Sequence, residues 1–180
     1  MRVTRHVYEV DGWGLGELWE ADGRVVVAHE APTRRRVGVA PTRPEGTAGA
    51  STETPAENTS RNRDGSVTEL LQRIQGFFAG SRDDFADVTL DLAGCTAFQL
   101  AVATTLRQVR WGELVAYGEL AALAGYPRAG RAAGTFCANN RHFLLVPCHR
   151  VVAGDGIGSY GSLGTSYKRR LLRLEGHATL

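Results

Sequence analysis

Residues 146–152 constrain this chain most, because they set a thiol, an imidazole and a guanidinium in a row between two hydrophobic arms. The arms, residues 143–146 and 151–152, are typical of buried chain, so Cys148 between them should lie at the edge of a core. Pro147 has no N–H to give to a strand ladder and should end any strand just before the cysteine. The stretch therefore predicts a small polar cluster anchored in a core.

The same stretch suggests chemistry at Cys148. A free thiol is mostly protonated at neutral pH, and it becomes nucleophilic only when a base or a positive charge lies close by. His149 and Arg150 are its neighbours in the sequence and supply both. Most buried cysteines are inert core residues, and these three residues alone leave that alternative open.

Composition places the chain among soluble globular proteins. It has 180 residues, of which 43% are hydrophobic and 22% charged. No apolar run approaches the ~20 residues that span a bilayer, and the first residues lack the apolar core of a signal peptide, so we expect a cytoplasmic protein without a membrane partner. Three irregularly spaced cysteines, Cys95, Cys137 and Cys148, fit neither a disulfide framework nor a zinc cluster. We therefore expect a reducing compartment and no metal.

Charge divides the chain into two halves. Residues 1–93 carry 11 basic and 15 acidic side chains, net −4, whereas residues 94–180 carry 10 basic and 4 acidic, net +6. The second half is the one suited to contact phosphates. We predict an N-terminal α/β domain over 1–93, with a flexible loop over 40–66 that is rich in Pro, Thr, Gly and Ser, and a second domain over 94–180 that carries the positive charge.

In the first half, short apolar or alternating runs are separated by Asp11-Gly12 and Asp22-Gly23. Asp-Gly between such runs is a hairpin signal and predicts a small antiparallel sheet. Ser66 and Glu69 form a capping-box pattern that opens a helix ending near Gly80. The alternation over 87–92 predicts one more strand.

In the second half the periodicity predicts helices over 96–109, 117–125, 129–138 and 168–175. The second and third are short and joined by a turn containing Pro127, which is typical of a helix-turn-helix. We thus expect an α/β protein: a small antiparallel sheet plus helix, followed by a mainly helical, winged helix-turn-helix-like catalytic domain.

Residues 147–151 resemble the Pro-Cys-His-Arg-Val signature of the O6-alkylguanine-DNA alkyltransferases, also called methylated-DNA–protein-cysteine methyltransferases. Over about eighty residues, further matches follow in the family's order: Phe98-Gln99, Gly112, Tyr117, Leu123-Ala124-Gly125, Pro127, Ala129, Arg131-Ala132, Gly134, Asn140 and Glu175. So many agreements in one order are a stronger signal than the cysteine motif alone. The first half fits the family only in size and coarse pattern.

The resemblance implies a DNA repair protein without a cofactor, monomeric in solution, whose partner is double-stranded DNA containing O6-alkylguanine, and also O4-alkylthymine. The damaged base would be rotated out of the duplex, and Cys148 would take its alkyl group irreversibly, in a single turnover. His149 would act as a base on Cys148 through water, and Glu175 would orient the imidazole. Tyr117 would donate to the leaving purine, and Asn140 would brace the pocket wall.

For DNA contact, the resemblance implies that Arg131 fills the space left by the rotated base and that Tyr117 pushes on the 3′ phosphate. Ala132 and Gly134 would lie against the minor groove, where small residues let the helix backbone approach. For the substrate pocket, it implies that the backbone at Val151 reads the exocyclic amine; Ser162 is the choice for the O6 side, and Phe143 is a bulky residue at the approach.

Other functions remain open at this point. A non-catalytic lesion-binding module would keep the fold without the chemistry, although the joint presence of Cys148, His149 and Glu175 argues against it. A thiol hydrolase or redox sensor would use the Cys-His pair without DNA, so Arg131→Ala should not affect it. A transcriptional regulator would need further domains, of which this sequence has no sign.

Overall fold

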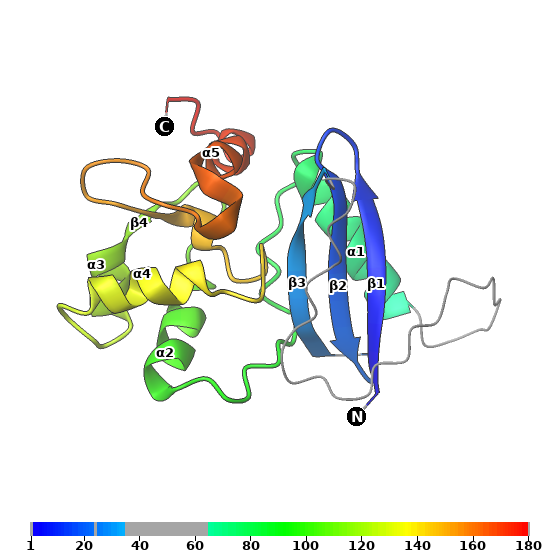
Figure 1. Ribbon diagram of the computed structural model, residues 1–180, viewed down its shortest axis with the longest axis horizontal. Coiled ribbons are helices and arrows are strands. Elements are labelled where there is room, and N and C mark those ends of the chain that lie inside the picture. The colour runs from blue at the N-terminus through cyan, green and yellow to red at the C-terminus, as the bar shows by residue number, and fades with distance from the viewer. Residues whose placement is uncertain (1, 24, 35–64, 180) are drawn as a thin grey trace.

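The computed structural model describes residues 2–23, 25–34 and 65–179, the last range from its backbone alone at residues 65 and 66. It confirms a mixed α/β protein: a small antiparallel sheet at one side of the molecule and a group of helices at the other (Figure 1). Residues 40–64 of the predicted loop lie outside the described residues. So does the Ser66 side chain of the predicted capping box.

The sheet has three strands in the order β1-β2-β3, namely β1 Val3–Val10, β2 Gly14–Ala21 and β3 Val25–Thr33. Both pairs are antiparallel, with Val3 opposite Ala21 in the first. The two Asp-Gly turns lie where the sequence predicts, and Gly12 and Gly23 have φ +72°, which a glycine adopts without strain. Helix α1, Gly65–Phe78, lies along one face of the sheet (Figure 1).

The predicted strand over 87–92 is wrong. The chain makes a single parallel bridge there, between Leu90 and Val26 of β3. Side chains bond two carbonyls of this segment: the Arg107 guanidinium donates to Val88 at 2.7 Å, and the His142 ring lies 3.0 Å from the carbonyl of Asp91. Carbonyls that a side chain already satisfies do not need a strand partner.

The helical half contains α2 to α5, two short 3₁₀ turns and a two-stranded parallel ribbon. Their bounds are α2 Ala97–Leu106, β4 Val115–Ala116, α3 Tyr117–Leu123, α4 Gly130–Ala138, η1 Cys148–Arg150, β5 Val151–Val152, η2 Gly161–Leu163 and α5 Gly164–Leu174. Helix α2 opens with a capping box between Thr96 and Gln99 and ends three residues earlier than predicted. Helix α5 begins four residues earlier than predicted.

Helices α3 and α4 pack very closely at their N-terminal ends. A Cβ built on Gly130 would lie 3.1 Å from the Cα and the nitrogen of Gly118. Nine in ten Cβ contacts in proteins are longer than this, so a side chain at Gly130 would force the two backbones apart by a few tenths of an ångström. The glycine therefore sets the distance between α3 and α4.

The two halves of the chain share one core. The aromatic and aliphatic side chains of the sheet and α1, such as Ile74 and Phe77, are packed in the same cluster as Leu145 and Leu171. Residues 143–146 are buried as predicted, but as tight turns rather than a strand, with Leu144 at φ +66°. The backbone of His29 in β3 donates to Arg141 and accepts from Phe143, at 2.8 and 3.0 Å. The chain entering Cys148 is thereby tied to the edge of the sheet.

Candidate functional site: a buried thiol beside a cavity

A cavity of about 480 Å³ lies between β3, the end of α4 and η2. Its lining includes Cys148 together with Cys137, Asn140, Phe143, Tyr160 and Ser162. A larger cavity of about 590 Å³, between the start of α2 and the outer side of α4, does not include Cys148 in its lining. The smaller cavity is therefore the candidate site.

Cys148 opens the η1 turn, directly after Pro147, and its side chain is almost fully buried. Burial raises the pKa of its thiol well above the ordinary value, and contact with the Cys137 thiol raises it further. A hydrogen bond with Asn140 and the charge of Lys168 lower it by smaller amounts. The free protein thus holds this sulfur as a neutral thiol, which needs a base to react.

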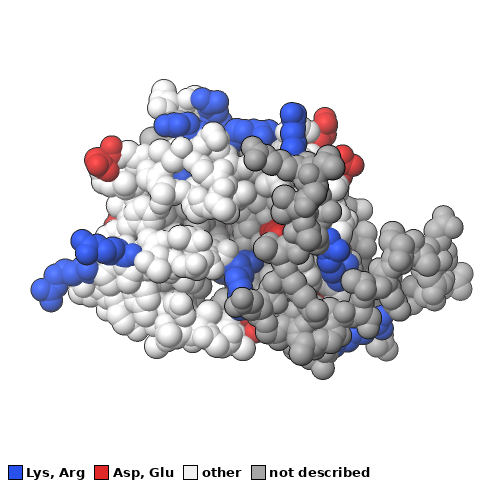
Figure 2. Space-filling model, viewed as in Figure 1, with Lys and Arg blue, Asp and Glu red and all other residues white. Residues whose placement is uncertain are grey.

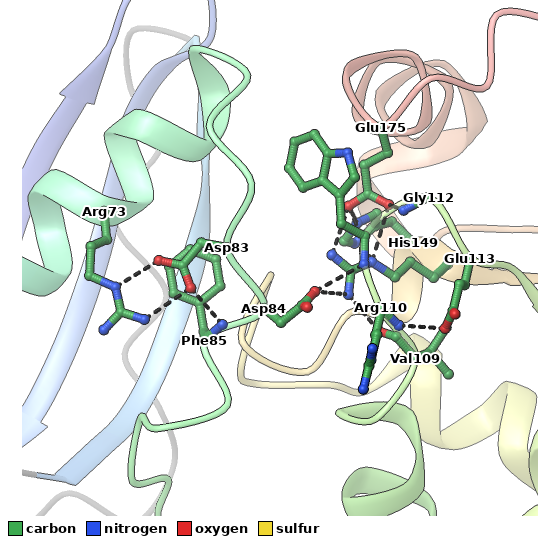
Figure 3. A network of polar contacts seen from close by, with 12 residues as sticks. Arg73, Asp83, Asp84, Phe85, Val109, Arg110, Gly112, Glu113, His149 and Glu175 are labelled. Atoms are coloured by element: carbon green, nitrogen blue, oxygen red, sulfur yellow. Dashed lines mark hydrogen bonds and ion pairs between the residues drawn. The ribbon is translucent and has the colours of Figure 1, made fainter.

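His149 and Glu175 form a buried pair, with Nε2 of the imidazole 2.9 Å from Oε1 of the carboxylate (Figure 3). Burial lowers the pKa of His149, outweighing the carboxylate's attraction, so the ring is neutral at pH 7. Burial raises the pKa of Glu175, but hydrogen bonds and charge attraction from His149 and Arg150 outweigh it and lower the pKa to about 2. An ionised Glu175 assigns the proton of the ring to Nε2 and leaves Nδ1 as an acceptor.

Arg150 completes this network from the inside of the molecule. Its guanidinium, 2% exposed, donates to both oxygens of Glu175 at 2.9 to 3.1 Å, to the carbonyl of Val109 at 2.6 Å and to Asp84 at 3.1 Å. The backbone N–H of Gly112 donates to Oε2 of Glu175, the oxygen that His149 does not contact. Figure 3 shows Asp84 reaching this group from the first half of the chain.

Asn140 holds the turn that delivers the cysteine. Its amide nitrogen donates to the carbonyls of His142 and Val146, at 3.3 and 2.9 Å, and its oxygen accepts from the His142 N–H at 3.0 Å. These three bonds replace the ladder that a strand would have supplied over the buried residues before Pro147.

Tyr117, the first residue of α3, lies between α4 and the loop after β5. A Cβ on Gly158 would come within 3.2 Å of its ring, so this glycine makes room for it, whereas a Cβ on Gly134 would lie at an ordinary contact distance of 3.8 Å. Its hydroxyl donates to the Ser159 carbonyl at 3.3 Å. Burial raises the pKa of Tyr117, which keeps the hydroxyl protonated and able to donate.

Lys168, the single lysine of the chain, is a residue whose role the sequence did not reveal. It is completely buried in α5 and donates to the carbonyls of Val151, Ile157 and Ser159 at 2.5, 2.6 and 3.3 Å. Burial lowers its pKa to about 8. It holds the loop after β5 against the site.

Three of the four predicted DNA-contacting residues lie on α4, and the fourth, Tyr117, begins the neighbouring α3. Arg131 and Ala132 are exposed at the start of α4, and Gly134 is half-buried one turn on, against Tyr117. Figure 2 shows basic side chains at the α3–α4 end of the molecule and along α5.

The predicted pocket residues divide into two groups. Ser162, exposed in η2, and Phe143 both line the cavity, but Phe143 also packs in the core against Phe78 and Tyr167. Val151 is fully buried beneath the site, and its carbonyl accepts from Lys168.

Sequence reasoning overlooked Lys168, Asp84 and Cys137. A lone lysine in a chain otherwise rich in arginine was the only available signal for the first. No sequence signal indicated Asp84 or Cys137, because only folding brings these residues to the site. Within the described ranges, no helix is long and apolar enough to cross a membrane, and no group of three or more His, Cys, Asp or Glu residues could hold a metal.

The fold and the cavity define a protein with a buried cysteine on a cavity, next in sequence to a buried histidine–carboxylate pair, and comparison with known proteins identifies its relatives. Residues 97–177 match the family model of the 6-O-methylguanine DNA methyltransferase DNA-binding domain. The methylated-DNA–protein-cysteine methyltransferase of Metallosphaera sedula is 40% identical over 111 residues, 62% of this chain and 69% of that protein. The one from Mycobacterium leprae is 39% identical over 117 residues, 64% and 69% respectively.

Among solved structures, the Mycobacterium tuberculosis OGT in complex with DNA matches with a TM-score of 0.68 and 29% identity, covering 95% of this chain and 92% of that one. The M. tuberculosis O6-methylguanine methyltransferase matches with a TM-score of 0.72 and 28% identity, covering 99% and 95%. The chain belongs to the methylated-DNA–protein-cysteine methyltransferase family. The family resemblance and the enzyme class predicted from the sequence are thereby confirmed.

Proposed function

We propose that the protein repairs DNA by moving the alkyl group of O6-alkylguanine, and of O4-alkylthymine, onto the sulfur of Cys148. The observation that carries the proposal is the placement of this thiol on the cavity, next in sequence to the buried His149–Glu175 pair. A thioether is chemically stable and nothing in the site offers a way to cleave it, so each molecule acts once. No cofactor takes part in this reaction.

The chemistry begins with removal of the thiol proton. Glu175 accepts from Nε2 of His149, so Nδ1 carries the free lone pair. This Nδ1 is buried and makes no hydrogen bond within the described part of the chain. A water between Nδ1 and the sulfur would pass the proton of Cys148 to the imidazole, and the ionised Glu175 stabilises the resulting imidazolium.

The leaving group also needs support. As the C–O bond to the alkyl group breaks, negative charge develops on the purine. Tyr117, held between Gly134 and Gly158, supplies a protonated hydroxyl for that charge. Lys168 keeps the loop carrying Ser159 in place beside it. Ser162 lines the cavity from η2, where it would contact the O6 side of the base.

DNA would be bound through residues 94–180, with α3 and α4 as a helix-turn-helix. A base inside the stack cannot reach a buried sulfur, so it has to be extruded, at a cost of a few kcal/mol. Arg131 is exposed at the start of α4, where it would fill the space of the extruded base, and the neighbouring Ala132 lets the helix backbone approach the minor groove. The protein would act as a monomer.

Intact mass spectrometry tests the proposal. After incubation with a duplex containing one O6-methylguanine, the protein should gain one methyl group, mapped to Cys148 and absent in Cys148→Ala. A parallel incubation with O4-methylthymine tests the second substrate. Tight binding of the methylated duplex without any mass gain over hours would instead identify a lesion-binding module.

A further inference from the structure

The cavity holds a second thiol. Cys137, in the last turn of α4, lines the same cavity as Cys148 and packs in the same hydrophobic cluster. Burial raises the pKa of Cys148, and the neighbouring Cys137 is a further cause that raises it. Cys137 is the more accessible of the two, half-buried where Cys148 is 3% exposed.

The surroundings favour reaction between these two sulfurs over other pairings. The third cysteine, Cys95, lines the other cavity, beside the start of α2. The Lys168 ammonium lies close enough to attract negative charge on both Cys137 and Cys148. A thiol next to a cation and to a second thiol is the arrangement in which oxidation ends in a disulfide.

We propose that Cys137 is a redox partner of Cys148 and that hydrogen peroxide converts the pair into a reversible disulfide across the cavity. The Cys137 thiolate attacks one peroxide oxygen, the O–O bond breaks, and a sulfenic acid forms while the second oxygen leaves as water. The Cys148 sulfur then attacks the sulfenic sulfur, the S–O bond breaks, and a second water leaves. Two thiols lose two electrons, and hydrogen peroxide is reduced to two waters.

The disulfide would regulate the alkyl transfer, and this consequence rests on the proposed function. Once it is bonded to Cys137, the sulfur of Cys148 is no longer a free thiol, so it cannot accept an alkyl group. The bond also stops oxidation of Cys148 short of the sulfinic acid, which thiol reductants do not reverse. A protein that can transfer only one alkyl group would thereby be protected from irreversible oxidation of Cys148.

Peptide mapping of the peroxide-treated, full-length protein tests the disulfide directly. Trypsin cuts after Arg131, Arg141 and Arg150, so Cys137 and Cys148 fall in the separate peptides 132–141 and 142–150. We expect these peptides to be joined after treatment and separated by dithiothreitol. Transfer from O6-methylguanine DNA should fall about tenfold or more and return after reduction.

Two variants serve as controls. Cys95→Ser should respond to peroxide as the parent does. Cys137→Ser, compared with its own untreated sample, should form no cross-link and should recover less activity with dithiothreitol. The inference is overturned if peroxide leaves the two peptides unjoined, or joins either to the peptide that holds Cys95. If the reduced parent transfers no methyl group, the proposed function fails, whereas the mapping still decides on the disulfide.

Discussion

Glu175 shows at the scale of one residue how the site is held. Its carboxylate accepts from His149, Arg150 and the backbone of Gly112 at 2.9 to 3.2 Å, and it is 6% exposed. A buried charge is tolerated when it is paired and its lone pairs are used, and removing one partner leaves the other uncompensated. The same residue therefore sets the histidine tautomer and neutralises a buried arginine.

We predict that Glu175 makes stability depend on pH in the acid range. Its folded-state pKa, about 2, lies below the ordinary 4.5, so its contribution is complete above that value and is lost as pH falls toward 2. The loss should be on the order of 3 kcal/mol. His149, whose pKa is also lowered, adds the same sign but begins at a higher pH, near 6.5.

Urea unfolding of the parent and Glu175→Gln between pH 2.5 and 7 measures this contribution. At pH 7 the variant should be less stable by roughly 3 kcal/mol, because the buried Arg150 loses its buried charge partner and keeps only the more exposed Asp84. That difference should shrink as pH falls. Parallel curves for the two proteins would contradict the prediction.

At the scale of elements, the α3–α4 pair decides how Tyr117 and Arg131 are presented. Gly130 brings the two helix starts together, and Gly134 receives the Tyr117 ring. Because a glycine occupies the contact between these two helices, a larger residue there would overpack the contact.

We predict that Gly130→Ala destabilises the protein by about 1–3 kcal/mol, because the new Cβ would lie 3.1 Å from the backbone of Gly118. Gly118→Ala is the matched control. A Cβ there meets nothing within 4 Å, and alanine in a helix should be neutral or stabilising by up to about 1 kcal/mol. Thermal unfolding of both variants measures this, and equal shifts in Tm would show that the close approach is unimportant.

We predict that Arg131→Ala separates base extrusion from chemistry. Transfer from a duplex should slow about tenfold or more because nothing fills the emptied stack, whereas reaction with free O6-benzylguanine, which needs no extrusion, should be unchanged. Arg169→Ala, an exposed arginine on α5, is the charge-matched control. Equal loss on both substrates would place Arg131 in the pocket and not in the DNA.

At the scale of the whole molecule, the site depends on both halves of the chain. The cysteine turn is bonded to β3 through the backbone of His29, and Arg150 reaches Asp84. The hydrophobic cluster under the site takes side chains from the sheet, from α1 and from α5.

We predict that residues 94–180 expressed alone do not fold cooperatively. Without the first half, Phe143, Leu145 and Leu171 lose the cover that buries them, at a cost of about 2 kcal/mol each. Near-ultraviolet circular dichroism and thermal unfolding of this fragment, compared with the full chain, provide the measurement. A fragment with a sharp transition near the parent Tm would show that the second half is an independent domain.

Much of the architecture could be read from local patterns. The two Asp-Gly turns specify their own backbone geometry, and the apolar spacing of α1 and the small-residue run of α4 specify their helices. The strand over 87–92 did not form, and two of its carbonyls, those of Val88 and Asp91, are bonded instead by the distant side chains Arg107 and His142. Alternation reports a preference, and a tertiary hydrogen bond can override it.

The sequence by itself determined which reactive groups are present, since Cys148 and His149 are adjacent in the chain and the motif around them indicates the family. The family resemblance also implied Glu175 behind the imidazole, whereas only the tertiary structure decided on Lys168 beneath the loop and Cys137 on the cavity of Cys148. The physical reason is distance along the chain. Neighbours in sequence are bound to meet, whereas residues separated by a turn, a helix or half the protein meet only when burial of a shared core brings their elements together.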